Sequence, residues 1–142
     1  MTAVKNDCPF CEFNEDRVLK EGKHSYVIFS NPRLMPGHLL VITRRHIQRL
    51  SQMNNEERDE VLNFVTEFEE RILEKLSKGC DIRQNFKPYV ENSKTHIKHF
   101  HFHLNPRVFE DELYEKADVY RKPLYKELTG EERDKIAKLL IG

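Results

Sequence analysis

The sequence predicts an α+β fold in which an antiparallel sheet packs against one long helix and is followed by C-terminal helices. Short apolar segments separated by turn residues precede a single long stretch with helical periodicity. Further strand-like segments follow that stretch, and helix signals replace them near the end of the chain. We therefore expect one domain over residues 1–142, with a core of about residues 8–107 and a helical tail over residues 108–142.

The first elements are expected to form a β-hairpin over residues 17–29. Val18–Lys20 and Ser25–Phe29 have strand-like composition, and Glu21–Lys23 contains a glycine that suits the turn. After a proline-containing loop, residues 39–42 form an almost wholly apolar run. Such a run is typical of a strand that is buried on both faces.

The clearest helix is predicted over residues 54–78. Asn54 and Glu57 have the spacing of a capping box at its start, and Gly79 is expected to close its end. Apolar side chains recur at helical spacing, so one face is expected to belong to the core rather than to a cofactor site. This stripe consists of Val61, Val65, Phe68, Ile72 and Leu76.

Two further strands are expected after the long helix. Residues 81–90 are the weaker candidate, and residues 97–105 are a strong one that Pro106 is expected to end. The second segment alternates between histidine and apolar residues. Successive side chains of a strand point to opposite faces, so three imidazoles about 7 Å apart would line one face. These are His99, His101 and His103, with Phe100, Phe102 and Leu104 entering the core.

The tail is expected to be helical. Residues 109–114 form a short helical segment, and a last helix is predicted over residues 130–140. Thr129 and Glu132 have the spacing of a second capping box. No internal repeat, low-complexity stretch or long linker divides the chain.

Charge and composition argue against several classes of protein. Twenty-four Lys and Arg balance 24 Asp and Glu, so the total charge gives no footprint for bulk nucleic acid or an anionic membrane. No apolar run approaches the roughly 20 residues that span a bilayer, and residues 1–7 lack a signal-peptide core. We therefore expect a cytoplasmic protein, with no membrane and no bulk nucleic acid as partners.

The three cysteines indicate metal or redox chemistry rather than a disulfide framework. Their odd number and the absence of a secretory signal argue against structural disulfides. Cys8 and Cys11 form a C-x-x-C pair, and a thioredoxin-like role is disfavoured because the pair precedes any βαβ pattern. Cys80 is expected to be an ordinary, partly buried thiol.

The histidine spacing alone does not identify a reaction. A row of imidazoles suits a ligand with several charged oxygens, or a metal, and it also occurs on an ordinary solvated strand face. An upstream motif narrows these alternatives. It runs from Pro-Gly-His at residues 36–38 through the apolar run to Arg-Arg-His at residues 44–46.

Together the two motifs resemble the histidine triad (HIT) superfamily, with matching order and separation from about Cys8 to Arg107. Asn105 is a small departure, because it stands where that family usually has an apolar residue. The resemblance implies a nucleotide-binding α+β domain, normally a homodimer, with the helix after Asn54 as the natural partner surface. It also implies an enzyme that cleaves or transfers nucleotides at an α-phosphate.

The same resemblance assigns catalytic roles by position. His101 would attack the phosphate and form a nucleotidyl-histidine, with its tautomer fixed by the backbone carbonyl of His99. His103 would donate a hydrogen bond to the phosphate or the leaving group, and His38 would complete the pocket. A neutral imidazole suits the nucleophile, because the unperturbed pKa of histidine is about 6.5.

The C-x-x-C pair resembles that of the zinc-bearing branch of the superfamily. Position by position, the zinc ligands would be Cys8, Cys11, His46 and His99, a set of two sulfur and two nitrogen atoms that suits tetrahedral zinc. With no open coordination position, the zinc would be structural.

The substrate contacts match the family less closely. The usual Gly-Gln-Ser/Thr element before the triad corresponds to residues 94–96, and Ser30 stands where an Asp or Asn usually binds the ribose. Lys94 and Lys98 suit a longer phosphate chain but are more simply explained as solvated side chains. The candidate contacts are Asn31 for the ribose and Gln84, Asn85, Thr95 and His96 for phosphate.

The substrate expected from these motifs is a dinucleoside polyphosphate, a nucleoside phosphoramidate or a similar compound. Two alternatives stay open. One is a zinc-stabilised nucleotide-binding adaptor with little turnover, which the weak phosphate element favours. The other is a metal-binding protein whose triad itself holds the ion.

Overall fold

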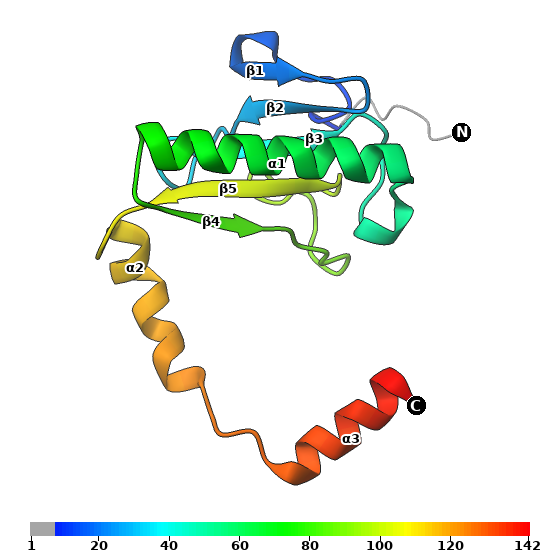
Figure 1. Ribbon diagram of the computed structural model, residues 1–142, viewed down its shortest axis with the longest axis vertical. Helices are drawn as coiled ribbons and strands as arrows, with labels where there is room; N and C mark the ends of the chain where they lie inside the picture. Colours follow the sequence, from blue (N-terminus) through cyan, green and yellow to red (C-terminus); the bar gives the residue numbers. More distant parts are fainter. Residues whose placement is uncertain (1–7) are drawn as a thin grey trace. The chain divides into compact units, whose positions relative to one another are not determined.

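The computed structural model describes residues 8–142 and contains a five-stranded antiparallel sheet (Figure 1). Residues 1–7, to which the expectation of no signal peptide refers, lie outside the described part. The strands follow the spatial order β1-β2-β3-β5-β4, and the predicted α+β class is confirmed. They are β1 (Val18–Glu21), β2 (Ser25–Phe29), β3 (Leu39–Thr43), β4 (Gly79–Arg83) and β5 (His101–Arg107).

The core lies on both faces of the sheet. On one face, the helix α1 (Asn55–Lys75) packs against β2, β3 and β5; the N-terminal segment and the loop before β5 cover the other. Val27 and Val41 face α1, whereas Tyr26 and Ile42 face the N-terminal segment. Because both faces of the sheet are covered, β3 is buried along its whole length. Each fully buried apolar side chain contributes about 1.5–3 kcal/mol of stability.

The start of α1 is as predicted, but its end is different. The Asn54 side chain accepts a hydrogen bond from the backbone N–H of Glu57, and the Glu57 carboxylate accepts one from the N–H of Asn54. The expectation that Gly79 closes the helix is wrong. The helix ends earlier, where the N–H groups of Leu76 and Ser77 both donate to the carbonyl of Ile72. Gly79 instead begins β4, where a Cβ atom would lie 3.3 Å from the carbonyl oxygen of Arg107.

The last two strands differ from the predicted ones in their bounds. Residues 84–90 are not strand, and β5 begins at His101 rather than at residue 97. Pro106 does not end β5 but lies within it, opposite Cys80 of β4. A proline is tolerated there because β3 pairs with β5 only as far as Leu104, which leaves β5 a single neighbouring strand beyond that residue.

The chain divides into two compact units, one that runs to Val108 and one over 109–142. The second unit contains α2 (Glu112–Lys116), a 3₁₀ helix η3 (Asp118–Leu124) and α3 (Gly130–Ile141). The predicted helical segment over residues 109–114 therefore begins later than expected. The Thr129 side chain caps α3 by accepting from the N–H of Glu132 at 3.1 Å.

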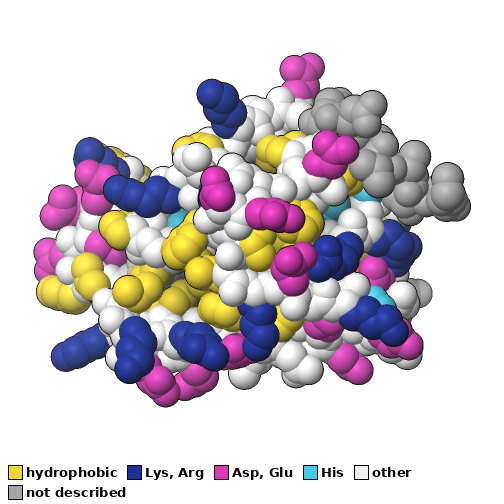
Figure 2. Space-filling model, turned by 90° about the horizontal axis from the view of Figure 1, so that it is seen from above, with side chains coloured by type: hydrophobic (Ala, Val, Ile, Leu, Met, Phe, Trp, Pro, Cys, Tyr) yellow, Lys and Arg dark blue, Asp and Glu magenta, His cyan; other side chains and the backbone are white. Residues whose placement is uncertain are grey.

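Basic and acidic side chains are mixed on the surface. Figure 2 shows basic and acidic side chains interspersed around a group of apolar side chains on one face of the molecule. Within residues 8–142, no helix has the length and apolar character that a membrane crossing requires.

A carboxylate from α1 fixes the turn of the β1–β2 hairpin. Glu60 accepts hydrogen bonds from the backbone N–H groups of Lys23 and His24 and from the hydroxyl of Ser25, which is fully buried. A buried polar group without its partner costs about 1–3 kcal/mol. The carboxylate therefore attaches the hairpin to the helix.

We expect Glu60→Ala to lower the free energy of unfolding by about 2 kcal/mol, because three donors lose their acceptor. Urea unfolding followed by circular dichroism measures the change. Glu70→Ala, which removes an exposed carboxylate from the same helix, is the matched control and is expected to change stability by less than about 0.5 kcal/mol. Equal effects of the two substitutions would contradict the role given to Glu60.

Candidate functional site

Two of the three alternating histidines lie side by side on β5. His101 and His103 are opposite Ile42 and Leu40 of β3, and their ring centroids are 4.7 Å apart. They lie on the face of the sheet away from α1, where Phe10 of the N-terminal segment packs edge-on against His101. His99 comes before the strand and is only 2% exposed.

The hydrogen bonds of His101 determine which ring nitrogen carries the proton. Its Nδ1 atom lies 2.6 Å from the backbone carbonyl oxygen of His99. A carbonyl only accepts hydrogen bonds, so Nδ1 bears the hydrogen and Nε2 keeps its lone pair. Burial lowers the pKa of His101, against the opposing effect of the carbonyl. The ring is therefore neutral near pH 7, with Nε2 available as a nucleophile.

A second chain of hydrogen bonds assigns the tautomer of His103. The backbone N–H of Leu34 donates to Nδ1 of His38 at 3.0 Å, so the hydrogen of His38 is on Nε2. This Nε2–H donates to Nδ1 of His103 at 2.9 Å, which leaves the hydrogen of His103 on its own Nε2. Burial lowers the pKa of His38 to about 4 and that of His103 to about 3, so both rings are neutral donors.

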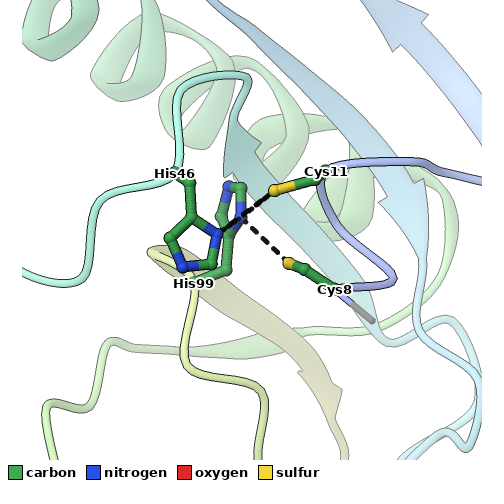
Figure 3. A group of neighbouring side chains, drawn as sticks. All are labelled: Cys8, Cys11, His46 and His99. Atoms are coloured by element: carbon green, nitrogen blue, oxygen red, sulfur yellow. Dashed lines mark hydrogen bonds between the residues drawn. The ribbon is translucent and has the colours of Figure 1, made fainter. Parts of the chain in front are cut away.

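Four further side chains meet beside this pair, with their ligand atoms all within 4.8 Å of one another (Figure 3). They come from the N-terminal segment, the loop after β3 and the residues just before β5. Ligand atoms 2.0–2.3 Å from a tetrahedral zinc would lie roughly 3.3–3.8 Å apart. The separations here are 3.2–3.7 Å for sulfur to nitrogen and 3.2 Å for nitrogen to nitrogen. The cluster can therefore hold a metal ion, and it consists of Cys8, Cys11, His46 and His99.

His99 belongs to this cluster through one ring nitrogen only. Its Nε2 atom lies 2.6 Å from the carbonyl oxygen of Thr43 and must donate to it. The lone pair of Nδ1 then faces the two cysteine sulfurs, as a metal ligand requires. Burial lowers the pKa of His99 to about 4, so the ring is in the neutral form that binds metals.

A cavity of about 700 Å³, a volume suited to a small ligand, is lined by neighbours of the histidine pair, and neither His101 nor His103 is itself among its lining residues. Its wall includes Phe10, which packs against His101, and Leu40, which is opposite His103. Cys8 and His46 also line it, so the cavity touches the metal cluster.

The structure brings together some of the expected substrate contacts and not others. Asn31 lines the cavity. Asn85 and His96 line a separate recess of only about 20 Å³, and the side-chain amide of Gln84 donates to the carbonyl of Asn85. The Thr95 hydroxyl lies 3.3 Å from that of Ser93, with which it shares a tight turn.

The cavity wall also contains residues that the sequence did not single out as contacts. Arg17 and Gln48 line it, as do Lys94 and Lys98, the two lysines expected to be solvated. The only sequence signal for the lysines is their nearness to the triad. Nothing local relates Arg17 to a site more than seventy residues farther along the chain.

Comparison with known proteins gives one family and many similar folds. The HIT domain family matches residues 12–110. Among solved structures, a member of the HIT family from Bacillus subtilis is 20% identical over 95% of each chain, with a TM-score of 0.70. No curated protein matches the chain.

Two other solved structures carry more specific descriptions. A Zn-bound histidine triad family protein from Mycobacterium smegmatis is 22% identical over 75% of this chain and 79% of that one, with a TM-score of 0.62. A HIT family hydrolase from Legionella pneumophila is 19% identical over 75% of this chain and 97% of that one, with a TM-score of 0.56. At these identities the likeness concerns the fold, and it confirms the expected HIT-like architecture.

We expect the free energy of unfolding to fall as the pH is lowered from 6.5 to about 4. Burial keeps the folded pKa of His38 at about 4, whereas the unfolded residue titrates near 6.5, so acid protonates the unfolded state first. A His38→Asn variant is expected to lose less stability over this interval in urea titrations. Parallel losses in the two proteins would show that His38 is not responsible.

Proposed function

The chain belongs to the HIT domain family, and on this basis we propose that it is an enzyme that cleaves or transfers nucleotides at an α-phosphate. The observation that carries the proposal is the bond from His101 Nδ1 to the His99 carbonyl, which directs the proton away from Nε2. A fixed tautomer next to a ligand-sized cavity is what a nucleophilic histidine requires.

In the proposed reaction, the lone pair of His101 Nε2 forms a bond to the α-phosphorus. The bond from phosphorus to the leaving oxygen or nitrogen breaks, and the leaving group takes its electron pair. Water or another acceptor then attacks phosphorus, the N–P bond breaks, and the lone pair returns to Nε2. The acceptor releases its proton to solvent, and the leaving group takes up a proton as its own pKa demands.

His103 and His38 act on charge and position in this scheme. The Nε2–H of His103 donates to a phosphate oxygen or to the leaving atom, where negative charge develops. His38 keeps His103 in the donor tautomer through their 2.9 Å hydrogen bond. Burial strongly lowers the pKa values of both rings. They therefore stay neutral and act as hydrogen-bond donors rather than as proton acceptors.

The proposed substrate is a dinucleoside polyphosphate or a nucleoside phosphoramidate. Asn31 is proposed to bind the ribose, and its position in the cavity wall supports this role. Gln84, Asn85, Thr95 and His96 remain proposed phosphate contacts, although none of them is among the residues that line the cavity.

We also propose that Cys8, Cys11, His46 and His99 hold a structural zinc ion. The two thiols, the two imidazoles and their spacing fit tetrahedral zinc, and the Zn-bound relative supports the choice of metal. When bound, the ion would supply a positive charge that ionises the thiols, which matters because burial raises the pKa of Cys8. It would also fix His99, whose carbonyl holds the nucleophile.

We further propose a cytoplasmic homodimer that contacts its second copy through α1. Leu62 and Leu73 on this helix are 52% and 38% exposed and would be covered by the partner. Light scattering after size-exclusion chromatography tests this, and a monomeric mass would refute it.

One observation favours a second candidate, a nucleotide-binding adaptor with little turnover. Thr95 is engaged with Ser93 in its own turn and does not line the cavity, so the phosphate element is weak. An adaptor would bind nucleotides in the same cavity and release them unchanged.

We expect His101→Ala to lower the hydrolysis of adenosine phosphoramidate and diadenosine polyphosphates by roughly a thousandfold, because it removes the proposed nucleophile. Steady-state kinetics measure the loss. His24→Ala, which changes a histidine outside the cavity, is the control and is expected to keep its activity. Nucleotide binding without turnover in the unaltered protein would favour the adaptor.

Metal analysis of the purified protein is expected to find one zinc ion per chain. Cys8→Ser and Cys11→Ser should each remove most of it and lower the melting temperature, because metal binding and folding share one free energy. Cys80→Ser is the matched control and should retain the zinc. A full complement of zinc in Cys8→Ser would refute the site, and a second ion per chain would favour a metal-binding triad.

A further inference from the structure

The charged side chains in the cavity wall all have the same sign. Among the described residues that line it, Arg17, Lys94 and Lys98 are basic and none is an aspartate or glutamate. The chain as a whole carries equal numbers of both kinds. Like charges around one cavity repel each other, and a ligand with several negative charges would relieve this repulsion.

Local hydrogen bonds fix the side chain of Arg17 and the backbone around the two lysines. The Arg17 guanidinium donates to the carbonyl of Phe29 at 3.0 Å, two residues before Asn31, which also lines the cavity. Lys94 lies in a tight turn closed by paired backbone hydrogen bonds between Ser93 and His96.

Lys98 is half-buried, and its backbone N–H donates to the side chain of Asn92 at 2.8 Å. Both lysines therefore belong to a loop whose shape is fixed by its own hydrogen bonds.

Among the described residues of the unit that runs to Val108, several other basic side chains form ion pairs with carboxylates, unlike these three cations. Lys20 pairs with Glu67, and Arg44 pairs with Glu21. Within residues 8–142, none of the three cations in the wall forms an ion pair with a carboxylate. Their charge is thus available to a ligand, and charge-assisted hydrogen bonds to phosphate are among the strongest that proteins make.

We propose that Lys94 and Lys98 bind the phosphates of the leaving group beyond the α-phosphate, and so make the chain selective for polyphosphate over single-phosphate substrates. The inference rests on the proposed function, which places the α-phosphate at His101. Phosphoramidates lack the additional phosphates and therefore gain nothing from the two lysines. Arg17, which bonds to Phe29 two residues before Asn31, adds to the positive field of the cavity.

The test compares the double variant Lys94→Ala/Lys98→Ala with the unaltered protein on diadenosine triphosphate and on adenosine phosphoramidate. For the triphosphate we expect kcat/KM to fall about tenfold or more, and for the phosphoramidate we expect a change of less than about twofold. Lys75→Ala/Lys78→Ala removes the same charge outside the cavity and is the matched control. Equal falls for both substrates, or equal falls in both double variants, would overturn the proposal.

A binding measurement separates this proposal from the proposed reaction. Inorganic triphosphate titrated by calorimetry should bind the unaltered protein more tightly than inorganic phosphate does. The preference should fall about tenfold in Lys94→Ala/Lys98→Ala and persist in the control. If no substrate is turned over but this preference is found, the reaction fails and the phosphate site stands. If turnover depends on His101 but the preference is absent, the site fails and the reaction stands.

Discussion

The arrangement of the candidate site depends on the position of one buried residue, His99. Its ring donates to the carbonyl of Thr43 and turns its other nitrogen toward the cysteines. Its own backbone carbonyl accepts from His101. A single residue thus fixes both the geometry of the candidate metal cluster and the tautomer of the candidate nucleophile. A displacement of the His99 ring in the cluster would therefore also displace the carbonyl that bonds to His101.

The sheet explains why His99 is held so firmly. It lies where the chain enters β5, next to β3, and the N–H of the following residue, Phe100, bonds to the carbonyl of Ile47. Phe100 is buried against α1 while His99 faces the opposite side. The alternation of the two residues across the sheet therefore connects the hydrophobic core to the site, because His99 cannot turn without displacing Phe100.

Local signals were sufficient for most of the fold. The β1–β2 hairpin, β3 and the start of α1 were predictable because turn residues, an apolar run and a capping box act over a few residues. The bounds of β5 were not, since they depend on how far β3 extends beside it and on the bond from Phe100 to Ile47. The place of Pro106 within β5 could not be predicted for the same reason.

The candidate site divides in a similar way. The four ligands of the cluster could be named because their types and order resemble a known family, and the structure brings them together. The loop over residues 84–98 could not be predicted, because its sequence has no helical or strand periodicity. Its course depends on individual contacts such as that between Ser93 and His96. The role of Lys98 in the cavity wall depends on that course.

The N-terminal segment that contributes Cys8 and Phe10 to the cavity has neither helix nor strand structure there. It is attached by side chains, among them the Tyr26 hydroxyl that donates to the carbonyl of Phe10. An ion in the cluster and a ligand in the cavity would therefore both contact this segment. Through this segment the proposed ion would also hold Phe10 and part of the cavity wall in place, and any change in affinity that ion or ligand caused in the other would be reciprocal.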